Sequence, residues 1–248
     1  MPPRRIIIDT DPGQDDAVAI LLALASPGEI EVLGLTAVAG NVPLALTEVN
    51  ARKVCEVAGR SDVKVFAGCD RPLARPLVTA EHVHGDTGLD GIELPAPVMP
   101  LQEGHAVDFI IDTLRDNAPG TVTLCVLGPL TNIATAFARA PDIAGRVQDI
   151  VLMGGAYFEV GNITPASEFN IHVDPEAAAQ VFASGARITV LSLDVSHKAL
   201  TSQAWLDGLR AMGTHVGDVV ASWTDFFERF DVEKYGSQGA PLHDPLVI

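Results

Sequence analysis

The stretch from residue 6 to residue 20 constrains this chain most, because it places four aspartates within eight residues between two apolar segments. Ile6 to Ile8 is a β-branched run, typical of a strand buried on both faces. Pro12 and Gly13 then impose a tight turn, and an apolar helical pattern follows over 17–25. We therefore expect the acids at the carboxyl end of a strand, in the turn that leads into a helix.

These four acids are Asp9, Asp11, Asp15 and Asp16. We expect Asp15 or Asp16 to cap the helix, whose positive dipole end tolerates acids but cannot neutralise four of them. Solvated turn and capping residues would explain an isolated Asp-Pro-Gly or Asp-Asp, but the combination favours a bound cation. Carboxylate oxygens without Cys or a nearby pair of His suit Ca²⁺ or Mg²⁺ better than Zn²⁺.

Strand-like and helix-like segments alternate along the rest of the chain. The predicted strands are 6–8, 31–38, 63–67, 121–127, 149–153 and 188–193, and the predicted helices cover 17–25, 43–58, 105–116, segments from 131 and 174, and 201–230. The irregular stretch 68–104 is long enough that we expect it to be functional or disordered. This alternation predicts an α/β fold with an open, mostly parallel sheet and helices on both faces. We expect a single domain over 1–248.

Composition excludes several classes of function. A net charge of −16 argues against binding to nucleic acid or to an anionic membrane. Cys55, Cys69 and Cys125 are odd in number and far apart, which is typical of thiols in a reducing compartment. We find no signal-peptide pattern and no apolar stretch long enough to span a bilayer, so we expect a cytoplasmic protein without a membrane partner.

Polar residues follow several of the predicted strands. Each could be an ordinary turn or core residue, but the carboxyl ends of parallel strands share one edge of the sheet, where ligands bind. We therefore expect these residues to converge on the aspartate cluster. They are Asn41 after the second strand, Met153 at the end of the fifth, and Asn162, Glu168, Asn170 and His172 in the loop beyond.

The histidines divide into two groups. His82 and His84 lie in a glycine-rich loop that is either exposed and inert or a lid that touches a substrate; without a third ligand, zinc is disfavoured. His243 precedes Asp244 and could supply an acid, a base or a hydrogen-bond donor. No role is assigned to the other histidines outside the polar loop, which are His105, His197 and His215.

The segment Asp9-Thr10-Asp11-Pro12-Gly13-Gln14-Asp15-Asp16-Ala17 resembles the signature of the inosine-uridine-preferring nucleoside hydrolase family, which cleaves the N-glycosidic bond of ribonucleosides. Further motifs follow in the order of the family: Gly40-Asn41, His82-Val83-His84-Gly85, Leu127-Gly128-Pro129-Leu130-Thr131-Asn132, Met153-Gly154-Gly155, Glu168-Phe169-Asn170 and His243-Asp244-Pro245. The resemblance covers essentially the whole chain and implies a Rossmann-like fold. Because members of the family continue for several dozen residues beyond the point matching Ile248, we expect the sequence to be incomplete at its C-terminus.

The resemblance also implies roles for individual residues. A Ca²⁺ that also binds a water and the ribose 2′- and 3′-hydroxyls would be held by Asp11, Asp16, Asp244 and the backbone carbonyl of Leu127. The ribose would be contacted by Asp15, Asn41, Met153, Asn162, Glu168 and Asn170. The base would be contacted by His82, His243 and Tyr235.

The implied reaction is Ca²⁺-dependent hydrolysis of a small-molecule ribonucleoside to ribose and free base. Asp11 would take a proton from the attacking water, and His243 would donate a proton or a hydrogen bond to the leaving base. No tryptophan lies in the His82 loop or in 231–242 to stack on a purine, which favours pyrimidine or mixed specificity. Homo-oligomers, either dimers or tetramers, are common in the family.

Two other classes fit parts of the pattern. A haloacid-dehalogenase-like phosphohydrolase also has a strand that ends in Asp-x-Asp, with Asp9 as nucleophile and Asp11 as acid/base. The turn that follows is wrong for that class, and no basic residue is placed to hold a phosphate. A non-catalytic ribose- or nucleoside-binding protein could share the fold, since fold does not prove activity.

Overall fold

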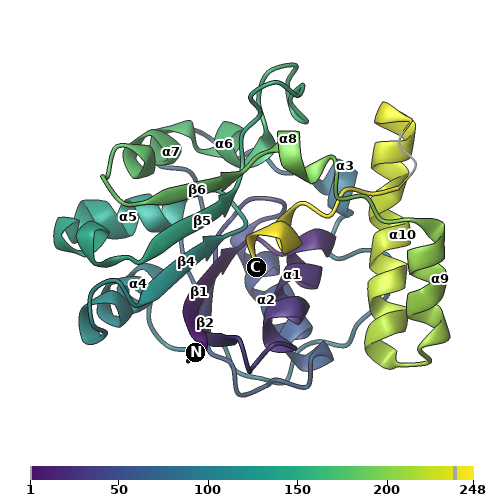
Figure 1. The fold of residues 1–248 in the computed structure, drawn as a ribbon, viewed down its shortest axis with the longest axis horizontal. Helices are drawn as coiled ribbons and strands as arrows, with labels where there is room; N and C mark the ends of the chain where they lie inside the picture. Colours follow the sequence, from purple (N-terminus) through teal and green to yellow (C-terminus); the bar gives the residue numbers. More distant parts are fainter. Residues whose placement is uncertain (1, 237–238) are drawn as a thin grey trace.

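The computed structural model of the chain describes residues 2–236 and 239–248, without the side chains of residues 231–235. In this part of the chain, six strands form one parallel sheet in the order β3-β2-β1-β4-β5-β6, with helices on both faces (Figure 1). The predicted α/β class and the parallel sheet are confirmed.

The strands are β1 (Arg4–Thr10), β2 (Ile30–Ala37), β3 (Val65–Ala67), β4 (Val122–Val126), β5 (Asp149–Met153) and β6 (Ile188–Leu191). The α-helices are α1 (Gln14–Leu24), α2 (Leu44–Val57), α3 (Glu81–His84), α4 (Ala106–Asp116), α5 (Thr131–Arg139), α6 (Phe169–Val173), α7 (Pro175–Phe182), α8 (Leu193–Ser196), α9 (Gln203–Ala211) and α10 (His215–Tyr235). Two 3₁₀ segments complete the fold, η1 (Pro141–Arg146) and η2 (Asp244–Val247).

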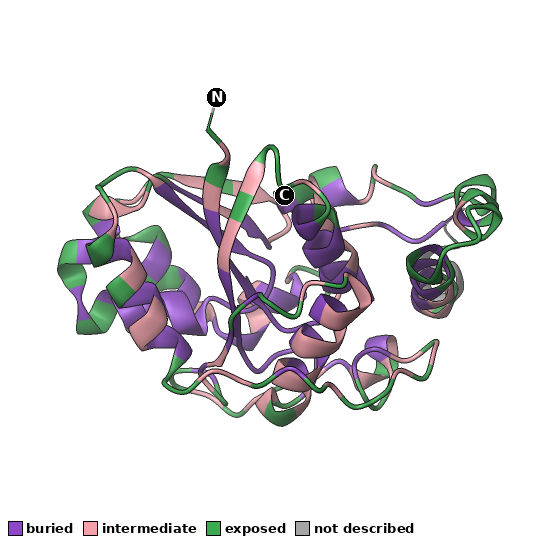
Figure 2. Ribbon diagram, turned by 90° about the horizontal axis from the view of Figure 1, so that it is seen from below, coloured by how far each residue is buried: buried purple, intermediate pink, exposed green. Residues whose placement is uncertain are grey.

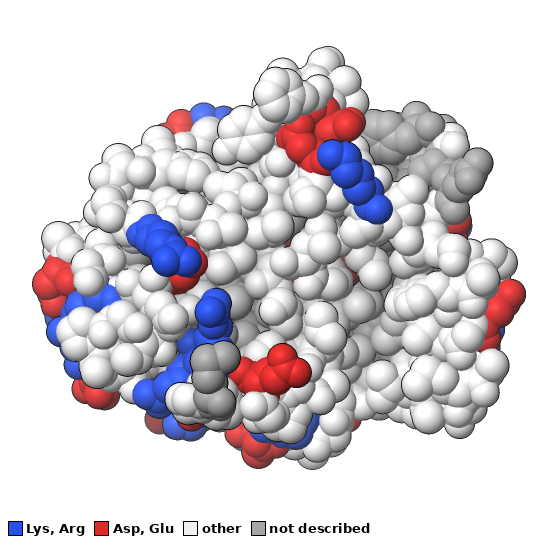
Figure 3. Space-filling view, in the orientation of Figure 1, with Lys and Arg blue, Asp and Glu red and all other residues white. Residues whose placement is uncertain are grey.

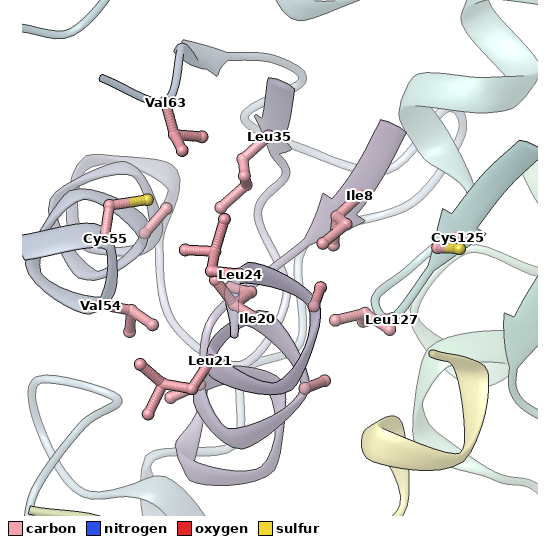
Figure 4. Close-up of a cluster of buried hydrophobic side chains, with 14 of the residues drawn as sticks. Ile8, Ile20, Leu21, Leu24, Leu35, Val54, Cys55, Val63, Cys125 and Leu127 are labelled. Atoms are coloured by element: carbon pink, nitrogen blue, oxygen red, sulfur yellow. The ribbon is translucent and has the colours of Figure 1, made fainter. Parts of the chain in front are cut away.

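Strand β1 lies in the middle of the sheet and is buried on both faces, as its β-branched sequence predicts. Ile6 and Ile8 pack with residues of α1, α2 and α10, in the cluster shown in part in Figure 4. Ile7 points to the opposite face, into a second cluster with α4, α5 and α7. Burial of each isoleucine contributes about 1.5–3 kcal/mol. Figure 2 shows buried residues concentrated on the sheet and on the helix sides that face it.

The segment 201–230 is helical, as predicted, and consists of two helices, α9 and α10, separated near Gly213, which adopts a left-handed φ of 61°. One local prediction is wrong. The cap of α1 is Gly13 and not Asp15 or Asp16. Asp16 instead lies in the first turn of the helix and accepts a hydrogen bond from the Gly13 N–H at 3.0 Å. Asp15 and Asp16 both line the pocket described below.

The stretch 68–104 has little regular structure but is tied to the sheet at several points. The Ala80 N–H donates to the Asn41 carbonyl at 2.8 Å, and the Gln102 N–H donates to the Val65 carbonyl at 2.9 Å. The first of these bonds holds the start of α3 beside the loop that follows β2, and the second holds residue 102 at the start of β3. No helix among the described residues has both the length and the apolar character needed to cross a membrane.

The strand order reverses between β1 and β4. The chain moves outward from β1 through β2 to β3, and then returns to β4 on the other side of β1. In open α/β sheets such a reversal leaves a crevice outside the carboxyl ends of the two central strands. The aspartates that follow β1 are therefore positioned at this crevice.

A buried asparagine forms hydrogen bonds with groups at the ends of three strands beside the crevice. The Asn132 Nδ2 donates to Asp9 Oδ1 at 2.8 Å and to the Ala37 carbonyl at 3.1 Å, while its Oδ1 accepts from the Cys69 N–H at 2.8 Å. One side chain on α5 thus satisfies groups on β1, at the end of β2 and after β3. Leaving such groups buried without partners is costly.

We expect Asn132→Ala to lower the free energy of unfolding by about 2–4 kcal/mol, because several buried polar groups lose their partners. Urea denaturation measures this loss. Arg139→Ala on the same helix is the control, since the exposed Arg139–Asp108 ion pair should contribute less than about 1 kcal/mol. Equal stability of Asn132→Ala and the wild-type protein would contradict the assignment.

Candidate active site

A pocket lies over the crevice at the carboxyl ends of the central strands. Its walls come from the start of α1, from α3, from the loop between β5 and α6, from the residue after α8, from α10 and from η2. The lining residues are Asp15, Asp16, Asn41, Ala80, His82, Val83, His84, Leu127, Met153, Asn162, Ile163, Glu168, Phe169, Asn170, His197, Phe227, Phe230, His243 and Asp244. One end of this pocket is acidic, and the other carries imidazole and phenyl rings.

The acidic end gathers carboxylates from opposite ends of the sequence. Asp15, Asp16 and Asp244 are buried, and one oxygen of each lies within 4.8 Å of the others. Asp244 begins η2, which packs against α1 and so brings residue 244 to the turn after β1. Asp11 lies fully buried next to this group. The expected convergence of the last carboxylate on the N-terminal cluster is present.

Hydrogen bonds fix two of these carboxylates in place. Asp16 accepts from the Thr10 hydroxyl at 2.6 Å in addition to the Gly13 N–H. Asp11 Oδ2 accepts from the Asn41 N–H at 2.8 Å, and the Asn41 Nδ2 donates to the Asp11 carbonyl at 3.1 Å. Asn41 therefore joins the turn after β1 to the turn after β2.

Two glycines allow the Asp11 carboxylate to occupy its position. A Cβ atom on either Gly40 or Gly128 would collide with the Asp11 carboxylate oxygens. This close approach explains why the turns after β2 and β4 each carry glycine. Of the two Asp11 carboxylate oxygens, Oδ2 accepts the hydrogen bond from Asn41, whereas Oδ1 is buried and has no hydrogen-bond partner among the described residues.

Burial of so many acids raises their affinity for protons. Burial, and then the neighbouring Asp16, raise the pKa of Asp11 well above its ordinary value. Burial, followed by the charges of Asp15 and Asp16, raises the pKa of Asp244 well above its ordinary value. Burial also raises the pKa of Asp16. These buried carboxylates cannot all remain ionised unless a bound cation offsets their negative charge.

The donor set fits a hard divalent cation. It consists of carboxylate oxygens, and Asp11 Oδ1 is an unpaired buried acceptor next to them. The Leu127 carbonyl accepts from the Asn170 Nδ2 at 2.7 Å, which leaves its second lone pair for another partner. The three mutually close carboxylates are those of Asp15, Asp16 and Asp244, so Asp15, expected at the ribose, is also within reach of a cation.

The middle of the pocket is held by side chains that bond to backbone. Glu168 caps α6: its Oε1 accepts from the Asn170 N–H at 2.8 Å, and its Oε2 accepts from Gly155 at 3.0 Å and Ile171 at 3.1 Å. Burial raises the pKa of Glu168 above its ordinary value. The Asn162 Oδ1 accepts from the Phe169 N–H at 2.8 Å. These polar groups are consequently rigid parts of the wall.

The opposite end of the pocket is a series of ring contacts. His82 meets Phe230 edge-on at 5.7 Å between centroids, and His84 stacks on Phe227 at 5.5 Å. Phe227 in turn meets His243 edge-on at 6.3 Å. Planar, partly apolar surfaces of this kind suit a heterocyclic base.

Two of these histidines are buried and hydrogen-bonded. His84 Nδ1 lies 2.7 Å from Gln14 Oε1, and His243 Nδ1 lies 2.7 Å from Ser196 Oγ. Burial lowers the pKa of each histidine to about 3. Both imidazoles are therefore neutral near neutral pH in this structure.

The structure brings the sequence-predicted site residues together, with two exceptions. Asp11 lies beneath the pocket and not on its surface, and the side chain of Tyr235 lies outside the described residues. The metal-binding, substrate-binding and catalytic roles assigned to these residues stay predictions. His172 does not line this pocket.

Sequence reasoning missed several lining residues, among them His197, Phe227 and Phe230. His197 could have been found, because it follows the last predicted strand and so belongs to the same edge of the sheet. The i, i+3 spacing of Phe227 and Phe230 on a helix carried no separate signal, since core residues share it.

Asp9 cannot serve as the nucleophile of a phosphohydrolase in this arrangement. It is buried away from the pocket, and its Oδ1 accepts from the Thr36 hydroxyl at 2.5 Å and from the Asn132 Nδ2 at 2.8 Å. Burial raises the pKa of Asp9 to about 7. The Asp9 backbone carbonyl accepts a hydrogen bond from the Leu127 N–H at 2.8 Å, so Asp9 connects the end of β1 to the end of β4.

Known proteins resemble the chain over nearly its whole length. An uncharacterized protein of Schizosaccharomyces pombe is 54% identical over 244 residues, which cover 98% of this chain and 78% of that protein. The pyrimidine-specific ribonucleoside hydrolase RihA of Salmonella arizonae is 46% identical, with the same coverage of 98% and 78%.

A solved structure and a family profile agree with these relatives. The plant nucleoside hydrolase PpNRh1 superimposes with a TM-score of 0.94 at 37% identity, over 99% of this chain and 77% of that one. The profile described as inosine-uridine preferring nucleoside hydrolase matches residues 6–248. The chain therefore belongs to the inosine-uridine preferring nucleoside hydrolase family.

Proposed function

We propose that this protein is a Ca²⁺-dependent ribonucleoside hydrolase that releases ribose and free base, with pyrimidine or mixed specificity. The observation that carries the proposal is the cluster of buried carboxylates at the crevice between β1 and β4, facing a pocket that ends in imidazole and phenyl rings. A sugar would be bound at the acidic end and a planar base at the other.

The residues proposed to hold the cation are Asp11, Asp16, Asp244 and the Leu127 carbonyl. All-oxygen donors and several charges in a small volume suit Ca²⁺, which accepts six to eight oxygen ligands in flexible geometry. When bound, the cation would supply charge compensation, a lower pKa for coordinated water and chelation of two vicinal hydroxyls.

The ribose would be recognised by polar groups that are already oriented. Asp15 reaches the pocket from the first turn of α1, and Asn41 faces it from the turn after β2. Asn162, Glu168 and Asn170 are tied to backbone groups, which limits the entropy lost when they contact a hydroxyl. Met153 would pack against the sugar ring.

Cleavage of the glycosidic bond passes through a positively charged, oxocarbenium-like sugar. The carboxylates at the acidic end would stabilise that charge as it develops. Asp11 Oδ1 would accept the proton of the attacking water, a role that suits an oxygen without another donor. His243, neutral and held by Ser196, would donate a hydrogen bond to the leaving base.

Base preference is proposed from the rings at the far end of the pocket. The lining rings are phenylalanines and histidines, and both tryptophans lie elsewhere, Trp205 on α9 and Trp223 in the core. A broad indole platform for a purine is thus missing from the described lining. The similarity to a pyrimidine-specific RihA supports the same preference.

We further propose a cytoplasmic homo-oligomer, a dimer or tetramer, that does not bind nucleic acid. The three cysteines are free thiols, consistent with a reducing compartment. On the face shown in Figure 3, the Lys and Arg side chains lie beside acidic ones, so they form no separate basic patch there.

Removal of divalent ions should abolish ribose release. We expect the protein to release ribose from uridine in Ca²⁺, to lose this activity in excess EGTA and to regain it when Ca²⁺ is restored. Ca²⁺ at about 100 times its Kd should also stabilise the fold by about 2.7 kcal/mol. A reducing-sugar assay and thermal denaturation measure the two effects; EGTA-resistant activity would contradict the proposal.

Asp11→Asn should separate catalysis from folding. We expect kcat on uridine to fall about 10²–10⁴-fold through loss of the base. Its stability in EGTA should equal or exceed that of the wild type, because a buried charge among like charges is removed. Asp62→Asn, at an exposed aspartate paired with Arg60, is the control and should leave both unchanged. An active Asp11→Asn variant would remove Asp11 from the mechanism.

Base preference is tested by relative kcat/KM. We expect uridine or cytidine to be cleaved at least as efficiently as inosine, because the described lining offers phenyl and imidazole rings and no indole. Parallel assays with the three nucleosides, scored by released ribose, measure this ratio. A strong preference for inosine would contradict the proposed specificity and leave the hydrolase function intact.

A further inference from the structure

We propose that His197, oriented by Glu159, is a proton donor to the leaving base. This inference rests on the proposed function, and it concerns a histidine that no sequence motif singled out. His197 lines the pocket and follows α8, and its ring centroid lies 5.9 Å from that of His243. It therefore extends the series of rings proposed to meet the base.

A carboxylate distinguishes His197 from the other pocket histidines. Its Nδ1 lies 3.5 Å from Glu159 Oε2, the one histidine–carboxylate ion-pair distance among the described side chains. When the ring carries a proton on both nitrogens, its Nδ1–H faces this carboxylate. The second nitrogen, Nε2, can then act as a donor.

The position of Glu159 is itself fixed by the segment that carries His197. Asp194, on α8, accepts hydrogen bonds from the backbone N–H groups of Tyr157 at 2.8 Å, Phe158 at 2.8 Å and Glu159 at 3.1 Å. The α8 turn thus holds the 157–159 loop through its backbone, while the Glu159 side chain returns to His197. Because α8 and the 157–159 loop hold each other in place, His197 is positioned before the substrate binds.

Access to solvent also suits the proposed role. An acid that donates once per turnover must regain its proton from water. The side chains of His197 and Glu159 are 20% and 43% exposed, so the pair connects the pocket wall to solvent. His243 is 8% exposed, and it is less suited to proton exchange with solvent.

The proton that His197 gives up and the proton that Asp11 accepts balance over one turnover. The bond between C1′ and the base nitrogen breaks with its electron pair remaining on the base, and the base takes the Nε2 proton of His197. Water oxygen bonds to C1′ and passes its proton to Asp11. His197 then takes one proton from solvent, and Asp11 returns one, so that nucleoside and water yield ribose and neutral base.

The test compares two leaving groups in His197→Gln. Uridine needs a proton on its departing base, whereas the 4-nitrophenolate of 4-nitrophenyl β-D-ribofuranoside leaves without one. We expect kcat on uridine to fall by about 10²–10⁴-fold, the usual contribution of a general acid, with little change on the nitrophenyl riboside. Retained nitrophenyl activity also shows that the variant is folded.

Glu159→Gln should reproduce this selective loss in weaker form, and Glu159→Asp should restore part of it. The control is Phe158→Ser, in the same loop but with a side chain that is 99% exposed. Equal losses on both substrates, or no loss on uridine, would overturn the assignment of His197. If the wild-type protein cleaves neither substrate, the proposed function fails, and not this inference alone.

Discussion

The burial of acidic side chains at one edge of the sheet is the constraint on which the site depends. Asp9, Asp11, Asp15, Asp16 and Asp244 are all at most 6% exposed; the last three line one end of the pocket, and Asp11 lies beneath them. Isolated carboxylates at such depth are strongly disfavoured. The backbone donors of Asn41 and Gly13, the Thr10 hydroxyl and the glycines beside Asp11 offset part of this cost. Protons or a divalent cation must compensate for the remainder.

The parallel sheet makes this concentration of charge feasible. Reversal of strand order between β1 and β4 opens a crevice, and turns that follow different strands can then contribute one or two polar groups each. The hydrophobic clusters on either face hold the strand ends, so their polar groups need little reorganisation when a ligand binds. A rigid scaffold thus supports a site in which few residues are adjacent in sequence.

Much of this arrangement could be predicted from the sequence because it depends on local patterns. The β-branched run at Ile6–Ile8 and the Pro-Gly turn locate β1 and its acids, and the alternation of segments gives the sheet. Strand ends share an edge, so Asn41, Met153 and Asn170 could be placed together without knowledge of tertiary contacts. Capping was less predictable, because whether Gly13 or a neighbouring aspartate begins α1 depends on where each carboxylate finds a partner.

Contacts made by long loops and by helices near the C-terminal end of the sequence could not be predicted from local patterns. Phe227 on α10 reaches His84 and His243 only after α10 has packed against α1, and its sequence context is that of any apolar helix position. His197 had no motif, and its partner Glu159 lies in an exposed loop whose shape is set by Asp194. Side chains of this kind are identified by geometry and not by spacing.

The contact of η2 with α1 has a topological consequence. It closes a loop between the turn after β1 and residue 244, and closing a chain of that length costs several kcal/mol of conformational entropy. A cation shared by Asp11 and Asp244 would act as a reversible cross-link across this loop, comparable to a disulfide but formed without oxidation. Ion binding and the completion of tertiary structure would then be one coupled equilibrium, in which the activity of the cation would set the fraction of closed chains.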